Sequence, residues 1–291
     1  MRKDKPQFKK EYANLSPEKQ KNIIQQYELE VEYAKILKNT SNSAERGRLY
    51  HELYDKYFKE LPEHPLLLRS KDEKYIKEKV KRTIRFLYPY INPSTHFMEI
   101  GSGDCSITIG LSAHVKEVVG VDVSEEIMPE KSGLPENVKL CVSRDGTTLP
   151  FQQNYFHIAY SNQLIEHLHP DDAKIHVMNV RQILTKNGQY IFQTPHMFFG
   201  PHDVSVFFHN TPVGFHLKEY CNFELYFLLK KVGFTKVNLI TGIKGHRISL
   251  PIIFPMAIEL VLFWFPHSIR KYLSLLTPIR KCLNGHIIAV K

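Results

Sequence analysis

The sequence has few cysteines and no motif built from them. Its 291 residues include only four cysteines, at positions 105, 141, 221 and 282, and none forms a C-x-x-C pair. We therefore expect reduced, mostly buried thiols, and neither a zinc site nor a disulfide framework. The charged N-terminus, Met1–Pro6, is followed by no apolar segment of the kind found in signal peptides. With no secretory signal, the default expectation is a cytoplasmic protein.

Acidic residues are scarce near the C-terminus. Residues 244–291 contain 7 Lys/Arg and 1 Asp/Glu, residues 1–90 contain 21 and 14, and residues 91–243 contain 11 and 15. A mildly acidic central part thus lies between two basic flanks. Such flanks would suit an anionic substrate, a nucleic acid or an anionic membrane, although a solvated basic surface explains them equally well. With 43% hydrophobic and 24% charged residues, the composition is that of an ordinary globular protein.

Residues 1–92 are predicted to form a helical extension. Ser16-Pro17-Glu18 combines the N-cap, first-turn proline and early acid of a helix start. Two helices rich in tyrosine follow on either side of a polar break at 39–43, and a basic helix is expected over about 71–87. The tyrosine-rich faces favour packing against the rest of the protein over contact with a substrate.

From Pro93 onward, strand patterns alternate with helical ones, which predicts a mainly parallel α/β sheet. The first strand, Phe97–Ile100, contains an acid, Glu99, and leads into the turn Gly101-Ser102-Gly103. Glycines in such a turn let the backbone approach a ligand closely. The dinucleotide pattern G-x-G-x-x-G would require a further glycine where this chain has Ser106.

Acidic and polar residues follow the next strands. The second strand ends in Asp122, where an acid can accept hydrogen bonds from both ribose hydroxyls of an adenosine-like cofactor. A nicotinamide enzyme would use the same device, and a helix cap at Ser124 is the structural alternative. The third strand is followed by Asp145-Gly146, which by itself indicates a turn. The fourth strand ends in Ser161-Asn162, shortly before Glu166-His167.

Taken in order, these segments resemble the type 11 branch of the class I S-adenosylmethionine (SAM)-dependent methyltransferases. The resemblance is carried by E-x-G-x-G at 99–103, Asp-Gly…Leu-Pro-Phe at 145–151 and S-N-x-x-x-E-H-L at 161–168. It implies a Rossmann-like, seven-stranded, mainly parallel sheet whose antiparallel seventh strand is residues 283–291, with the helical extension added. The resemblance covers about 93–243 and 283–291. It departs from the family at His157, where an aspartate is usual.

The resemblance implies that SAM is the cofactor. The glycine turn would cradle its methionine end, the acid after the second strand would hold the ribose, and the Asp-Gly segment would approach the adenine. The cofactor-binding residues implied in this way are Glu99, Gly101, Ser102, Gly103, Asp122, Val123, Asp145, Gly146, Ser161 and Asn162.

Histidines are the candidate catalytic residues. Methyl transfer to an oxygen requires removal of a proton, and histidine suits that task near neutral pH. His167, His196 and His216 each lie at or just after the predicted carboxyl edge of the sheet. Glu166, His167 and His216 also resemble three of the four metal ligands of the small-RNA 2′-O-methyltransferases, in which Gln163 would be the departure. Whether a metal is used stays open.

The acceptor is predicted less sharply than the cofactor. The stretch 200–220 resembles methyltransferases of bacterial polysaccharides and secondary metabolites, which favours a hydroxyl of a small-molecule or glycan-linked acceptor. The alternatives are an RNA 2′-O-methyltransferase with a metal site and a lipid or quinol O-methyltransferase at a membrane surface. Two further hypotheses are an NAD-dependent oxidoreductase and a non-catalytic SAM-binding protein. Nucleic acid is the less favoured partner, and the oligomeric state is left open.

An apolar helical insert is predicted at about 245–282. Between Arg247 and Arg270 its one ionisable side chain, histidine aside, is Glu259. A transmembrane helix is disfavoured because Pro251 and Pro255 interrupt the segment, and because a span would separate the last strand from the sheet. Residues 248–269 are expected to be a helical lid, a subunit contact or a membrane-peripheral element.

Overall fold

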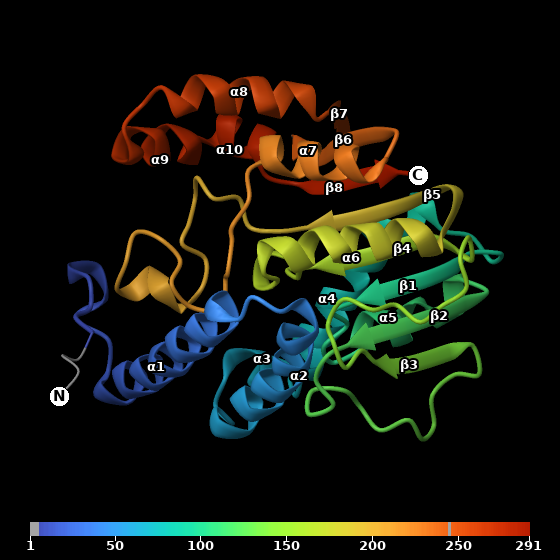
Figure 1. The fold of residues 1–291 in the computed structure, drawn as a ribbon, viewed down its shortest axis with the longest axis horizontal. Helices are drawn as coiled ribbons and strands as arrows, with labels where there is room; N and C mark the ends of the chain where they lie inside the picture. Colours follow the sequence, from blue (N-terminus) through green and yellow to red (C-terminus); the bar gives the residue numbers. More distant parts are fainter. Residues whose placement is uncertain (1–5, 244–245) are drawn as a thin grey trace.

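The computed structural model describes residues 6–243 and 246–291 (Figure 1). Met1–Lys5 and the predicted start of the insert at residue 245 lie outside these residues. The strands form one sheet with the order β3-β2-β1-β4-β5-β8-β6-β7. Their bounds are β1 (His96–Ile100), β2 (Glu117–Asp122), β3 (Val138–Val142), β4 (Phe156–Asn162), β5 (Leu184–Gln193), β6 (Lys236–Ile243), β7 (His246–Pro251) and β8 (His286–Val290).

The sheet is parallel from β3 to β5, and β8 runs antiparallel between β5 and β6. The predicted fold class is confirmed, including the antiparallel last strand. The sheet nevertheless has one more strand than predicted, because β7 adds an antiparallel edge to β6. The central strand β1 is buried at four of its five positions, as expected for a parallel strand covered on both faces.

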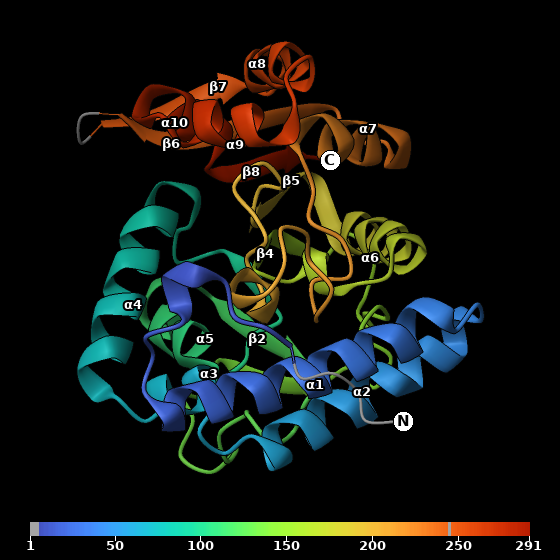
Figure 2. The ribbon, with the colours of Figure 1, turned by 90° about the vertical axis from the view of Figure 1, so that its left-hand side faces the viewer.

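Helices cover both faces of the sheet, as the end-on view in Figure 2 shows. One face packs against α4 (Glu73–Leu87) and α5 (Ser106–Leu111) through Leu87, Ile107 and Leu111. The other face packs against α6 (Pro170–Ile183) and α7 (Asn222–Val232). The carboxyl ends of β1, β2 and β4 meet at one edge, which is where open α/β sheets bind their ligands.

The N-terminal extension is helical as predicted; its second helix lies against that edge, whereas its last, α4, packs on one face of the sheet. It consists of α1 (Pro17–Asn39), α2 (Ser43–Glu60), the short α3 (Pro65–Arg69) and α4. Ser16 caps α1, its hydroxyl accepting from the Lys19 amide at 3.4 Å. A buried ion pair fastens α2 to α6: Arg46 donates to both carboxylate oxygens of Asp172 at 2.6 Å, and the Tyr50 hydroxyl donates to the same carboxylate at 2.9 Å.

The insert between β6 and β8 begins with a strand. After β7 it forms α8 (Ile253–Phe263), α9 (His267–Leu275) and α10 (Thr277–Leu283). Sequence analysis predicted helix throughout, whereas residues 246–251 instead pair with β6 because their alternating side chains suit an edge strand. None of the helices in the described residues is both long and apolar enough to cross a membrane.

Candidate cofactor and acceptor site

The turn after β1 has the open geometry that a bound cofactor needs. Gly101 and Gly103 have φ angles of +71° and +53°, in the left-handed region that favours glycine. The amides of Gly101 and Ser102 donate to the Val121 carbonyl at 2.8 and 3.0 Å, which fixes the turn against β2. A Cβ at Gly103 would meet only Ile127 Cδ1, at 3.8 Å. The turn therefore leaves room for a ligand beside its backbone.

Asp122 lies at the end of β2, directly beside this turn. One carboxylate oxygen accepts from the Gly103 amide at 2.7 Å and the other from the Ser124 amide at 3.0 Å. Each oxygen keeps a second acceptor position for a ribose hydroxyl. Burial raises the pKa of Asp122, while the backbone amides oppose that rise. In the described chain no helix follows Ser124 before β3, so Asp122 holds the turn and does not cap a helix, and its ribose contact stays a prediction.

Replacing Asp122 with asparagine is expected to weaken SAM binding about 100-fold, since two charge-assisted hydrogen bonds would be lost or weakened. Calorimetric titration with SAM measures the effect. Asp171→Asn, which changes an exposed acid at the start of α6, is the matched control. Equal affinity in Asp122→Asn and the wild type would remove Asp122 from the cofactor site.

The other predicted cofactor residues differ in what their side chains contact. Glu99 is buried at the end of β1, where it accepts from the Thr108 hydroxyl and burial raises its pKa to about 7. The Asp145 carboxylate closes its own turn by accepting from the Thr147 and Thr148 amides, at 3.0 and 2.6 Å. Its adenine role stays a prediction.

The pair at the end of β4 points in two directions. The Ser161 hydroxyl lies in the interior, 2.8 Å from the Tyr190 hydroxyl, whereas Asn162 is exposed at the strand end. Asn162 therefore has the freer side chain of the two for the methionine end of the cofactor.

Helix α2 covers the cofactor edge, a contact that sequence analysis did not assign. His51 Nδ1 lies 2.6 Å from the Val123 carbonyl oxygen, and the Ser124 hydroxyl donates to Asp55 at 2.5 Å. Tyr54 stacks on Phe215 with ring centroids 4.8 Å apart. Gly146 is also covered, since a Cβ there would lie 3.3 Å from the Tyr50 ring. In the sequence, the tyrosine-rich face of this helix was the available signal for the contact. Its packing places α2 between Val123, next to the proposed ribose contact, and the loop that carries His216.

A cluster of histidines and glutamates lies beyond the methionine end. Glu166 and His167 belong to a short 3-10 turn (Ile165–His167) after β4, and His216 comes from the loop after β5. One potential ligand atom from each of these three residues lies within 4.8 Å of the other two. Leu164, the residue before this turn, lies against the glycine turn, because a Cβ at Gly101 would be 3.2 Å from its side chain. The predicted histidines His167 and His216 thus lie next to the cofactor edge.

The hydrogen bonds orient these groups. His167 Nδ1 lies 3.0 Å from the Phe215 carbonyl oxygen, which makes Nδ1 the donor. His216 Nδ1 lies 2.9 Å from Glu219 Oε1. Both rings can therefore present Nε2 as a free acceptor. Glu166 Oε2 accepts from the Thr194 hydroxyl at 2.8 Å, while its Oε1 is buried without a hydrogen-bond partner among the described residues.

Burial sets the charges in this cluster. It lowers the pKa of His167 to about 3 and that of His216 to about 4, so both rings are neutral near pH 7. It raises the pKa of Glu166 to about 8 and that of Glu219 to about 7. Carboxyl groups that titrate near neutral pH beside neutral imidazoles are suited to proton transfer. Glu219 is the residue that sequence analysis missed.

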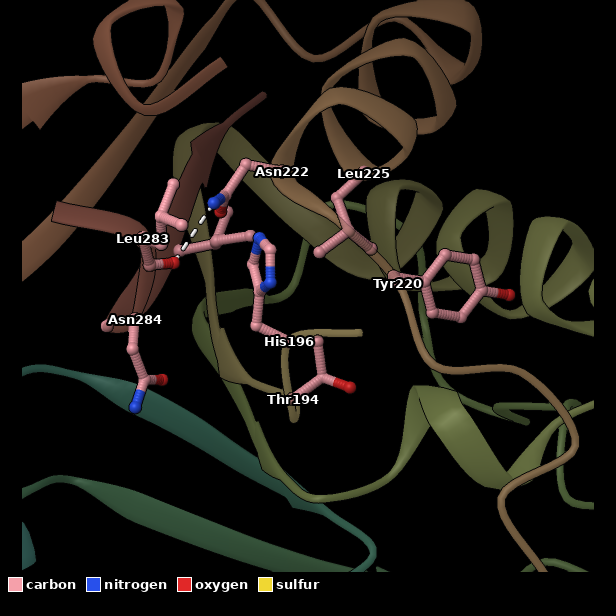
Figure 3. A pocket seen from close by; sticks show the side chains of 9 residues that line it. Thr194, His196, Tyr220, Asn222, Leu225, Leu283 and Asn284 are labelled. Atoms are coloured by element: carbon pink, nitrogen blue, oxygen red, sulfur yellow. Dashed lines mark hydrogen bonds between the residues drawn. The ribbon is translucent and has the colours of Figure 1, made fainter. Parts of the chain in front are cut away.

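His196 lies in a different environment from the other two histidines. Its Nε2 is 2.6 Å from Glu259 Oε1, and the Asn222 amides donate to the same oxygen at 2.8 and 2.7 Å. Figure 3 shows His196 between Thr194 and Asn222, where the cavity is only about 10 Å³ and can hold no more than one water molecule. The geometry favours a role in fastening α8 to the sheet, and a catalytic role for His196 stays an untested prediction.

The cluster of Glu166, His167 and His216 has the donor set of a divalent-metal site. Two imidazole nitrogens and a carboxylate suit zinc, manganese or iron. Their Nδ1 atoms are held by a carbonyl and a carboxylate, as is usual for metal-binding histidines. The unpartnered Oε1 of Glu166 fits a cation too. The residues therefore fit such a metal chemically.

Comparison with known proteins agrees with this geometry. Residues 98–192 match a family model described as "Methyltransferase domain". An uncharacterized methyltransferase of Schizosaccharomyces pombe is 27% identical over 118 residues, which cover 36% of this chain and 41% of that protein. The chain thus spans less than half the length of this curated relative.

A solved methyltransferase structure shares the fold of this chain. Haemonchus contortus phosphoethanolamine N-methyltransferase 1, in complex with phosphoethanolamine and S-adenosylhomocysteine, matches with a TM-score of 0.52 and 12% identity, over 84% of this chain and 49% of that chain. A SAM-dependent methyltransferase from Archaeoglobus fulgidus matches with a TM-score of 0.48 and 16% identity, over 74% and 94%. The family match, together with the glycine turn, shows that residues 98–192 belong to a methyltransferase domain, for which SAM is the cofactor.

Proposed function

We propose that this protein transfers the methyl group of SAM to a hydroxyl oxygen of a small-molecule or glycan-linked acceptor. The observation that carries the proposal is the pairing of His216 with Glu219 beside the cofactor edge. An oxygen acceptor must lose its proton during transfer, whereas a thiolate or a free amine needs no such base. His216, buried and paired with Glu219, would be the base that removes this proton.

The cofactor edge supplies the other half of the reaction. Bound SAM provides a methyl group on a positively charged sulfur, which is already a strong electrophile. The glycine turn and Asp122 would hold it at the carboxyl ends of β1 and β2. Glu219 orients the His216 ring so that Nε2 can take the hydroxyl proton. Helix α2, which packs over the cofactor edge, helps exclude water from the site.

Contacts around the loop after β5 support a compact acceptor. Tyr27 of α1 packs at a tilt against Phe208 and stacks on His209, with ring centroids 4.5 and 5.5 Å apart. The Tyr27 hydroxyl and His209 Nε2 are 2.6 Å apart. These contacts fasten the loop to the N-terminal helices on the acceptor side. That cover favours a small or end-presented hydroxyl over a nucleic-acid duplex.

A second candidate is a metal-assisted 2′-O-methyl transfer to RNA. It is favoured by the ligand geometry of Glu166, His167 and His216 and by the unpartnered Glu166 oxygen. The basic N-terminal part of the chain would suit an RNA backbone.

One assay separates the candidates. Labelled methyl transfer from SAM is measured on sugars, glycans, quinols, lipids and short RNAs, with and without a chelator. We expect transfer to a small hydroxyl or glycan acceptor, unchanged by chelation. Transfer to RNA that the chelator abolishes and Mn²⁺ restores would establish the second candidate instead. SAM binding without transfer to any acceptor would favour a non-catalytic protein.

A further inference from the structure

Exposed apolar side chains gather on α8, α9 and the turn between them. Of the eighteen large hydrophobic side chains that are exposed in the described chain, eleven lie within residues 253–276. We call these eleven the α8–α9 apolar face: Ile253, Phe254, Leu260, Val261, Phe263, Trp264, Phe265, Ile269, Tyr272, Leu275 and Leu276. Trp264, in the turn, is 89% exposed. Such a concentration marks an interaction surface, because single exposed hydrophobic residues are ordinary but large groups of them are not.

The outward direction of this face is fixed by a buried charge. Glu259 points inward from α8 and is fully buried, bonded to His196, Asn222 and the Phe223 amide. In α8 the residues 253, 254, 257, 260 and 261 recur at helical spacing on the outer side, and none is polar. This reverses the usual arrangement, in which the charged side of a helix faces water. A rotation of α8 could bury these apolar side chains only by breaking the hydrogen bonds of Glu259. The apolar side of the helix therefore stays exposed.

The exposed charges on the segment that carries this face are of one sign. Within the described residues 246–291, Glu259 is the one acidic side chain, and it is buried. Arg280 and Lys281 are exposed on the neighbouring α10. A second copy of this chain would bring the same positive charges together, which opposes a symmetric dimer through this face. An anionic lipid surface would instead be attracted by them.

The face is joined to the acceptor side of the fold. Phe198, in the loop after β5, packs on Phe263 with ring centroids 5.0 Å apart and is covered by the Arg270 guanidinium at 5.0 Å. Lys271 donates to the Gly200 carbonyl at 2.8 Å. In Figure 1, α9 lies on the same side of the molecule as the carboxyl ends of the parallel strands. An occupant of the face would thus lie near the entrance to the proposed active site.

We propose that the α8–α9 apolar face binds the interfacial region of an anionic membrane. Trp264 and Tyr272 are residues that favour the boundary between headgroups and acyl chains, and the aliphatic residues beside them supply buried apolar area. Arg280 and Lys281 add electrostatic attraction to the headgroups. The helices lie on the membrane surface and do not cross it. This docking does not depend on the proposed reaction, and it is measured without SAM.

The test is binding of the full chain to vesicles, by flotation. We compare pure phosphatidylcholine vesicles with vesicles containing about one third phosphatidylglycerol. Wild-type protein should bind the anionic vesicles and bind the neutral ones weakly. Trp264→Glu/Tyr272→Glu, which changes two highly exposed positions, should reduce binding at least about tenfold. Arg280→Ser/Lys281→Ser should reduce binding to anionic vesicles, roughly fivefold per charge, and should flatten its salt dependence.

The matched control is Leu66→Glu/Met178→Glu, which introduces the same two charges at exposed apolar positions on α3 and α6. It should bind vesicles as the wild type does. Unchanged circular dichroism and thermal midpoint of each variant would show that the fold is intact. Equal binding to neutral and anionic vesicles would overturn the proposal, as would failure to bind either. In the latter case, a concentration-dependent dimer lost in Trp264→Glu/Tyr272→Glu would identify a second copy as the occupant.

Discussion

Replacing His216 with alanine is expected to lower kcat about 10²–10⁴-fold, the usual contribution of a positioned general base. The ring is 6% exposed, and its Nδ1 is paired with Glu219 at 2.9 Å, which leaves Nε2 for the acceptor hydroxyl. SAM affinity should stay within a few-fold of the wild type, because the cofactor contacts lie on β1 and β2. Initial rates with the acceptor found in the methyl-transfer assay, together with SAM titration, measure both effects.

Glu219→Gln tests the pairing separately from the base. Burial raises the pKa of Glu219 to about 7. Below that pH its carboxyl is protonated and can donate to His216 Nδ1, which leaves the proton on Nε2, the wrong tautomer for a base. Above that pH the carboxylate accepts from Nδ1 and Nε2 is free. Wild-type activity should therefore rise with pH through about 7, and the glutamine variant should lose this rise.

A control excludes a general loss of fold. His114→Ala removes a histidine that follows α5, away from the cluster, and should leave kcat unchanged. If His216→Ala kept kcat within about threefold of the wild type, with an intact pH profile, another group would be the base. His167 would then be the next candidate, because its Nε2 is equally free and its ring centroid lies 4.9 Å from that of His216.

The parts of the site that are local in sequence could be predicted from it. The glycine turn and Asp122 each lie at the end of a strand, so a strand pattern followed by a characteristic residue is enough to place them. The antiparallel last strand was predicted from the resemblance of residues 283–291 to the family's seventh strand, and residues 286–290 form it. In each case the signal and the structural feature occupy the same few residues.

The parts made by contacts between distant segments could not be predicted. Glu259 reaches His196 across 63 positions, and no periodicity indicates that the single acid of an apolar segment should point inward. In the sequence, Glu219 cannot be distinguished from a surface acid. In the structure, the loop after β5 places it against His216. The edge strand β7 was taken for helix, because its alternation of apolar and polar side chains spans only residues 246–251 and adjoins a long apolar segment that does form helix.

Arg46→Met is expected to lower the free energy of unfolding by about 3–5 kcal/mol, since it leaves the Asp172 carboxylate buried without its cation. Both side chains are about 1% exposed and their bond is bidentate. Urea denaturation measures the loss. Arg48→Met, two positions along the same helix but exposed, should change stability by less than about 0.5 kcal/mol. A loss below about 1 kcal/mol for Arg46→Met would show that the pair does not hold α2 in place.

The same variant links the extension to function. Helix α2 carries His51, which contacts the Val123 carbonyl, and Tyr54, which stacks on the loop bearing His216. Loosening α2 should therefore weaken SAM binding even at temperatures where Arg46→Met remains folded. The double variant Arg46→Met/Asp172→Leu replaces the ion pair with apolar side chains and should regain much of the lost stability. If it regained stability and SAM affinity together, the extension would act on the cofactor through the docking of α2; regained stability with poor SAM binding would instead mean that Asp172 itself shapes the site.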